Sequence, residues 1–169
     1  MPRPDWTTDD FFDHYNDPDH HEDVSLDQIG LLDDFRRSPE IQALIEDLKS
    51  YYGDKMKGLL QQACADCPTA NTASVAYNAH EKDLDYDFHG RSRKDVLFVM
   101  GLGQLYSKGP CNAILNCKTG QFTGKCDLQF YVRDAFANPW DVFKNKFPFP
   151  IETGYPYKIR GDWDQTLSW

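Results

Sequence analysis

Long hydrophobic runs are absent from this sequence. Residues 1–12, "MPRPDWTTDDFF", have neither the basic start nor the apolar run of about 7–15 residues that secretion signals carry. No stretch approaches the roughly 18 apolar residues of a membrane span. We therefore predict a soluble protein without a transmembrane segment, made in the cytosol and, if it leaves the cell, carried by dedicated secretion machinery.

Basic residues are scarce relative to acidic ones. The chain has 18 Lys and Arg against 27 Asp and Glu, for a formal charge of −9. Residues 1–50 contain 14 of the acids and 4 of the bases, so the acidity belongs to one end. Binding to a phosphate backbone depends on clustered Lys and Arg. We expect no nucleic acid as a steady partner, whereas an acidic end of this kind is suited to a basic protein partner.

Several familiar catalytic patterns are also missing. There is no G-x-S-x-G, no Walker loop and no dinucleotide fingerprint, and "HEKDL", residues 80–84, lacks the second histidine of a zinc protease. The tract "HYNDPDHHED", residues 14–23, could bind a metal, but we favour a solvated loop.

The five cysteines cannot all pair within one chain. We favour buried or incidental thiols, because free cysteine is often buried. In an oxidising space one disulfide is plausible among Cys111, Cys117 and Cys126. A thiol–imidazole pair that joins Cys64 or Cys67 to His80 or His89 is a further alternative, with little around it in support.

The period of the apolar residues changes along the chain. Residues 1–67 are typical of helices. Thr7 or Thr8 caps the first helix, and residues 25–35 form the second. Ser38 with Pro39 begins the third helix, which ends at Gly53, and a fourth runs through residues 56–63. Residues 68–79 are a permissive hinge. Residues 80–165 then favour antiparallel strands at 83–91, 95–106, 111–117, 125–136 and 157–163, with a turn at 118–121 and a long loop at 137–156. We predict an α+β fold, with N-terminal helices followed by an antiparallel β-sheet in a single domain, 1–169.

One stretch of the sheet part carries chemistry. In "KDLDYDFHGRSR", residues 82–93, the apolar side chains of Leu84, Tyr86 and Phe88 alternate with a charged set. On a strand this set projects from one face, and we predict it as the catalytic site: Asp85, Asp87, His89 and Arg91. An aspartate or a divalent metal would orient the nucleophile, histidine would move a proton, and arginine would hold an anion. The same pattern is also the ordinary solvent face of a strand.

Two further aspartates lie near the end of the strand at 125–136. Asp134 and Asp141 could complete a site with the charged set. We favour a second interpretation, in which Asp134 caps a turn while Phe136 and Trp140 close the core.

Three segments of the second half suggest a family. "GRSRKDVLFVMGLGQLYSKG", "CDLQFYVRDAFANPWD" and "GYPYKIRGDW" together resemble C-terminal toxin domains of bacterial polymorphic toxins and type VI secretion effectors. The resemblance covers about half the chain and rests on spacing and residue type. It implies export to the periplasm or cytoplasm of a target cell, and a cognate immunity protein as partner. "DLDYDFHGR" is also faintly similar to the acidic and basic signature of colicin M-like enzymes, although its His89 and Arg91 follow too closely.

Two functions from different classes follow. The first is an exported antibacterial toxin domain, expected to be a hydrolase of cell-envelope or phosphodiester substrates, with Asp85, Asp87, His89 and Arg91 as its site. The alternative is a small acidic binding protein, an immunity protein or adaptor, with no catalysis.

Overall fold

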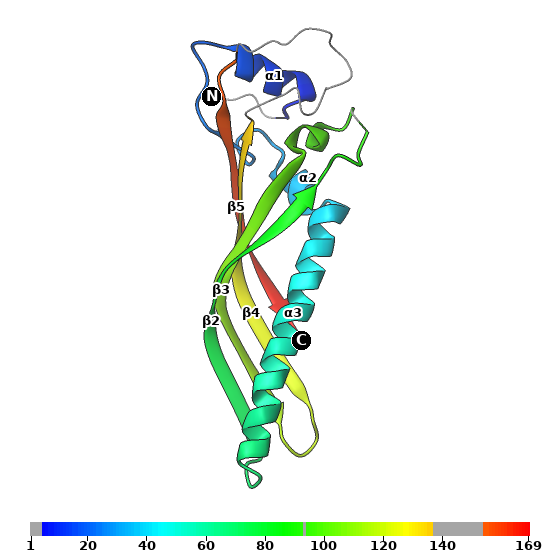
Figure 1. The fold of residues 1–169 in the computed structure, drawn as a ribbon, viewed down its shortest axis with the longest axis vertical. Helices are drawn as coiled ribbons and strands as arrows, with labels where there is room; N and C mark the ends of the chain where they lie inside the picture. Colours follow the sequence, from blue (N-terminus) through cyan, green and yellow to red (C-terminus); the bar gives the residue numbers. More distant parts are fainter. Residues whose placement is uncertain (1–4, 93, 137–153) are drawn as a thin grey trace. The chain divides into compact units, whose positions relative to one another are not determined.

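The computed structural model describes residues 5–92, 94–136 and 154–169, and within them helices precede a sheet (Figure 1). The elements are α1 (Thr8–Asn16), β1 (Val24–Ser25), α2 (Leu32–Arg36), α3 (Pro39–Asp66), β2 (Thr72–Asp87), the 3₁₀ helix η1 (Val96–Met100), β3 (Leu102–Asn116), β4 (Phe122–Phe136) and β5 (Tyr157–Ser168). The predicted α+β class is confirmed. None of the described helices has the length and apolar character needed to cross a membrane.

The five strands of the described residues form one sheet in the order β1-β5-β4-β3-β2. A tight turn joins β3 to β4, closed by the Asn116 N–H donating to the Gln121 carbonyl at 2.9 Å. Gly124 and Trp169 exchange both main-chain hydrogen bonds, which is the mark of an antiparallel pair, here between β4 and β5. The short β1 adds in parallel beside β5, with Val24 opposite Ile159, so the sheet is mixed and not purely antiparallel.

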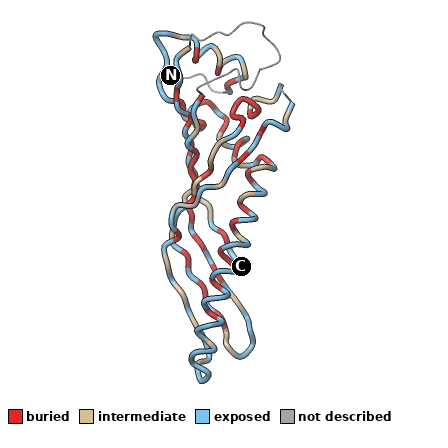
Figure 2. The backbone as a smooth tube through the Cα atoms, in the orientation of Figure 1, coloured by how far each residue is buried: buried red, intermediate tan, exposed pale blue. Residues whose placement is uncertain are grey.

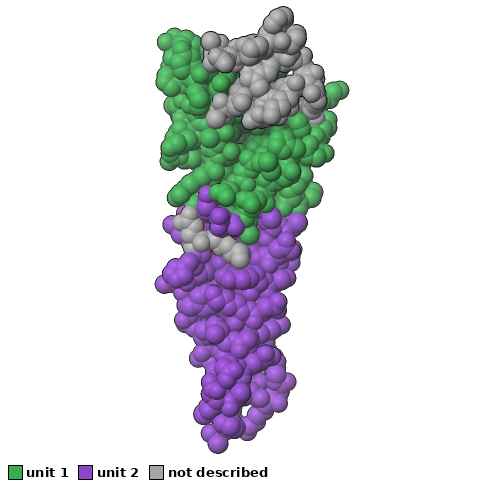
Figure 3. Space-filling model, viewed as in Figure 1, with its two compact units in different colours: residues 1–42, 84–105, 131–162 green, residues 43–83, 106–130, 163–169 purple. Residues whose placement is uncertain are grey.

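The chain forms two compact units (Figure 3). Unit 1 contains residues 1–42, 84–105 and 131–162, and unit 2 contains residues 43–83, 106–130 and 163–169. The division falls inside α3 and inside each of the four long strands. Each unit therefore contains part of α3 and part of the sheet.

In unit 2 the core lies between α3 and the sheet. The buried side of α3 carries Ile45, Leu48, Tyr52, Met56 and Leu60, spaced three or four residues apart as one helix face requires (Figure 2). The sheet contributes Cys111, Ala113 and Leu115 from β3, with Cys126, Leu128 and Phe130 from β4. The strand predicted at 125–136 is confirmed as part of β4.

Unit 1 has a core rich in aromatic side chains. Phe35 of α2 meets the rings of Tyr86 and Phe88 edge to face, with centroids 5.3 and 5.6 Å apart. The ring of Phe136 stacks on Tyr157 at 5.3 Å, and the Tyr157 hydroxyl donates to the Phe11 carbonyl at 3.0 Å. These contacts join α1, β4 and β5 within the unit.

Two predictions for the helices are wrong. The segment 25–35 forms β1, turns and the short α2, because the main chain from Ser25 pairs with β5 instead of starting a helix. Ser38 does cap α3, accepting from the Ile41 N–H at 3.4 Å, but Gly53 does not end it. A side chain at Gly53 would collide with the indole of Trp169, so this glycine permits close packing inside one continuous helix.

Two predictions for the second half differ from the structure, one is confirmed and one lies mostly outside the described residues. The expected hinge at 68–79 is largely the start of β2. The apolar run 95–106 begins as η1, since the Asp95 carboxylate accepts from the Leu97 N–H at 3.0 Å and fixes a helical turn before β3. Strand β5 confirms the strand expected at 157–163, while most of the expected loop at 137–156, with Asp141 and Trp140, lies outside the described residues.

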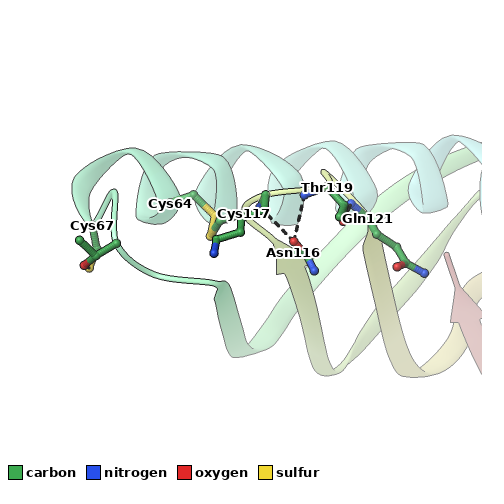
Figure 4. Close-up of a disulfide and its surroundings, with 8 residues drawn as sticks. Cys64, Cys67, Asn116, Cys117, Thr119 and Gln121 are labelled. Atoms are coloured by element: carbon green, nitrogen blue, oxygen red, sulfur yellow. Dashed lines mark hydrogen bonds between the residues drawn. A yellow bond between two sulfur atoms is a disulfide. The ribbon is translucent and has the colours of Figure 1, made fainter.

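Two disulfides link elements of unit 2. Cys64 at the end of α3 is bonded to Cys117 in the turn between β3 and β4 (Figure 4), and Cys111 of β3 is bonded to Cys126 of β4. Cys67 is free and exposed. The favoured interpretation as unpaired thiols is therefore wrong for four cysteines. The alternative of one bridge among Cys111, Cys117 and Cys126 anticipated half of the pattern.

Candidate functional site

The predicted charged set lies at the end of β2, in unit 1. Tyr86 and Phe88 are buried, as their alternation predicts, while Asp85, Asp87 and His89 are exposed. The strand ends at Asp87 and not at Arg91, so His89 and Arg91 lie in the following turn. The expected regular spacing of all four along one strand is wrong for these two.

The turn brings Asp87 and His89 together. One oxygen of Asp87, Oδ1, accepts from the His89 main-chain N–H at 2.8 Å and lies 3.0 Å from the His89 ring Nδ1. Gly101 leaves room for this ring, because a Cβ there would lie 2.9 Å from Nε2. Among the described residues nothing bonds Nε2, and the imidazole is 39% exposed. The pair therefore has an oriented ring with its second nitrogen available.

Arg91 is directed elsewhere. Its guanidinium forms a two-pronged pair with Glu40 at the start of α3, with Nε–Oε1 3.0 Å and Nη2–Oε2 2.8 Å. Its Nη1 meets the Asp95 carboxylate at 2.6 Å. The hydrogen bonds from Arg91 lower the pKa of Glu40, and Glu40 in turn raises the pKa of Arg91. Arg91 thus pairs with two carboxylates, those of Glu40 and Asp95. Through Glu40 it connects α3 to the turn that follows β2.

Asp85 makes a third, separate contact, in which its Oδ1 accepts from Gln104 Nε2 on β3 at 3.2 Å. Of the four predicted residues, the structure thus joins Asp87 to His89 and gives Asp85 and Arg91 other partners.

A pair that our sequence analysis missed lies on the buried side of the same sheet region. The Tyr86 hydroxyl of β2 donates to Asp134 Oδ2 of β4 at 3.0 Å, although β3 runs between them. Gly103 of β3 makes this reach possible, since a Cβ there would overlap the hydroxyl. The other carboxylate oxygen accepts from the Ala135 N–H at 2.7 Å. Asp134 lies within β4, so the favoured turn-capping role is wrong.

Both members of this pair have altered titration. Burial raises the pKa of Asp134 to about 6, against two hydrogen bonds that lower it. Burial also raises the pKa of Tyr86 well above its usual value, and the nearby Asp134 adds to the effect. The sequence held a signal for the site: Asp134 has the same parity as Leu128, Phe130 and Val132, and so is an acid on the inward register.

The sheet face of unit 2 that points away from α3 contains an open hollow of about 650 Å³. Polar side chains from all four long strands line it, including Asn78, Lys108, Asp127, Gln129, Asp164 and Thr166. Asp127 accepts from the Thr166 hydroxyl at 2.6 Å and pairs with Lys125 at 2.9 Å; these contacts lower its pKa. The described lining offers hydrogen bonds but neither histidine nor cysteine.

The described residues form neither a metal site nor a thiol–imidazole pair. Among the described residues no group of three or more His, Cys, Asp and Glu is placed to hold a metal. In the tract 14–23, His14 bonds the Glu22 carbonyl and Asp23 pairs with Arg160 at 3.0 Å. Cys64 has no thiol to offer as a nucleophile, since it is in a disulfide.

No protein-family model, curated protein or solved structure matches this chain.

Proposed function

We propose that this chain is an exported antibacterial effector domain that hydrolyses cell-envelope material, with Asp87 and His89 as its acid–base pair. The observation that carries the proposal is the 3.0 Å contact between Asp87 Oδ1 and His89 Nδ1 at an exposed turn. A carboxylate on one ring nitrogen fixes the imidazole and leaves the other nitrogen to take a proton from water or a substrate hydroxyl.

The roles follow from the contacts. His89 Nε2 is the general base, and Asp87 stabilises the imidazolium that forms. Asp85, two residues before Asp87, adds negative charge on the exposed side of β2 and would favour a positively polarised substrate group. Arg91 is a positioning residue, because its pairs with Glu40 and Asp95 hold the turn that carries His89.

The arginine pairs also favour one substrate class. Two carboxylates already satisfy the Arg91 fork, so a substrate phosphate would have to displace them. This supports an envelope substrate over a phosphodiester. Two disulfides support action in an oxidising space such as the periplasm, and a cognate immunity protein is the partner we expect for such an effector.

Expression of the chain in a susceptible bacterium, with and without a periplasmic leader, tests the proposal. We expect growth arrest only with the leader, and relief from arrest by His89→Gln or Asp87→Asn. His20→Gln and Asp83→Asn, on exposed residues of the same acidic chain, are matched controls that should remain toxic. Normal growth in both compartments, with folded protein present, would refute the toxin proposal.

A second candidate, an acidic binding protein without catalysis, is favoured by the exposed acids of the N-terminal part. Asp9, Asp13 and Glu22 are exposed and pair with no base among the described residues. A double variant, Asp85→Ala with Asp87→Ala, separates the two functions. A binder would keep its partner, whereas an effector would lose its toxicity while its circular dichroism spectrum is unchanged.

A further inference from the structure

One edge of the sheet in unit 2 has no partner among the described residues. Strand β2 is last in the order β1-β5-β4-β3-β2, so only β3 pairs with it (Figure 1). An edge strand presents a row of unpaired N–H and C=O groups to other chains.

The usual protection of such an edge is missing over residues 72–80, "TASVAYNAH". This stretch has no Asp, Glu, Lys or Arg, no proline and no glycine. Its even-numbered side chains from Thr72 to His80 are exposed. Soluble proteins usually place a charge, a proline or a bulge on an open edge to prevent pairing. The uncharged edge is therefore open to strand addition.

The main-chain groups that face outward can be identified. The Cys117 N–H donates to the Asn71 carbonyl at 2.9 Å, so residue 71 is turned toward the β3 side. Because N–H and C=O groups alternate in direction along a strand, residues 72, 74, 76, 78 and 80 are turned away from β3.

We propose that this edge pairs with the same edge of a second copy, antiparallel, about a two-fold axis at Ala76. In this register Ala76 faces its own copy and Ser74 faces Asn78, each as a hydrogen-bonded pair. On the α3 side Val75 faces Tyr77, an aromatic and β-branched pair of the kind that stabilises sheets. No charged side chain lies opposite another within 72–80.

Neighbouring registers fit less well. An axis at Asn78 would place Ser74 opposite the charged Lys82, and an axis at Ser74 would bring Pro68 opposite His80, where it has no N–H to donate. Within β2, which begins at Thr72, the axis at Ala76 thus retains the longest uncharged overlap, residues 72–80. This proposal does not depend on the proposed function.

The test is the molar mass in solution, measured by light scattering on a size-exclusion column. A Cys67→Ser background removes the exposed thiol, which could otherwise cross-link copies. At an ionic strength of roughly 0.15 M the Debye length is about 8 Å, so charge repulsion between the two acidic copies is screened beyond that distance. We expect a concentration-dependent dimer.

Charge exchange at the axis makes the test specific. Ala76→Lys or Ala76→Glu alone should weaken the dimer about fivefold, since like charges would face each other. An equal mixture of the two variants should restore it. Ile114→Lys, on an exposed residue of β3 in the same unit, is the matched control that should leave the dimer intact.

Four results would overturn the proposal. They are a monomeric parent at all concentrations, a dimer that Ala76→Lys leaves intact, a dimer that Ile114→Lys disrupts, and folded Lys and Glu variants that do not associate when mixed. A monomeric parent that instead binds a different protein through residues 72–80 would assign the edge to that partner.

Discussion

At the residue scale, an acid on the inward register of β4 accepts a hydrogen bond from a tyrosine hydroxyl. Asp134 accepts from Tyr86 and from the Ala135 N–H, and its pKa rises from 3.8 to about 6 because burial disfavours its charged form. Gly103 leaves the space through which the tyrosine reaches it. A substitution at Asp134, Tyr86 or Gly103 would therefore disturb the hydrogen bond between Tyr86 and Asp134.

Replacement of Asp134 by Asn tests this account through pH. The folded state holds the Asp134 proton more tightly than the unfolded state, so its stabilisation is full below about pH 3.8 and is lost as the pH rises through about 6. Asn keeps an acceptor for Tyr86 and cannot ionise. We expect Asp134→Asn to be more stable than the parent at pH 8, by up to about 3 kcal/mol.

Urea unfolding across pH 4 to 8 would measure this difference, which should vanish at the acidic end. Asp164→Asn, at an exposed acid of β5, is the matched control and should show no such trend. An Asn variant less stable than the parent at pH 8 would contradict the buried-acid account.

At the scale of elements, a disulfide joins the last turn of α3 to the turn between β3 and β4. The Cys64–Cys117 bridge spans 53 residues, and the Cys111–Cys126 bridge spans 15. A longer closed loop removes more entropy from the unfolded chain. The helix and the hairpin therefore depend on the first bridge more than neighbouring β3 and β4 depend on the second.

Paired Cys-to-Ser variants measure the two bridges separately. Loss of Cys64–Cys117 should lower the free energy of unfolding by about 4 kcal/mol, and loss of Cys111–Cys126 by about 3 kcal/mol. Chemical unfolding with linear extrapolation gives both values. If the two variants lose equal stability, or if the order is reversed, loop entropy does not govern the contribution of these disulfides to the free energy of unfolding.

Local signals predicted some elements well. Ser38 and Pro39 mark the start of α3, and the alternation from Cys126 to Val132 marks β4, because capping and parity are written in adjacent residues. Gly53 was misread because its reason, the Trp169 ring, is distant in sequence.

The contacts of the candidate site likewise differ in how well the sequence predicts them. Asp87 and His89 are two residues apart, so their proximity follows from local geometry. The partner of Arg91 is Glu40, 51 residues away, and no local pattern indicates it. Both disulfides and the reach of Tyr86 to Asp134 likewise depend on which strands become neighbours.

At the scale of the whole molecule, charge is unevenly distributed along the chain. Residues 1–50 have a formal charge of −10 and the remainder +1, and most acids near the N-terminus are exposed. Like charges brought together by folding repel each other. This repulsion opposes folding of the acidic part and is screened by salt.

We therefore expect the melting temperature to rise as NaCl is increased from roughly 0.01 M to 0.5 M, since the Debye length falls from about 30 Å to a few Å. Differential scanning fluorimetry would detect the rise. A variant with Asp9, Asp13 and Glu22 changed to their amides should show a smaller rise. A melting temperature that falls with salt would indicate that ion pairs such as Arg91–Glu40 outweigh the repulsion.

The redox state of the two disulfides of unit 2 also depends on the compartment in which each molecule matured. Each bond forms with the loss of two hydrogen atoms, so an oxidised chain is lighter than a chain that never left reducing surroundings. The intact mass of protein recovered from different cell fractions would then report where each molecule matured.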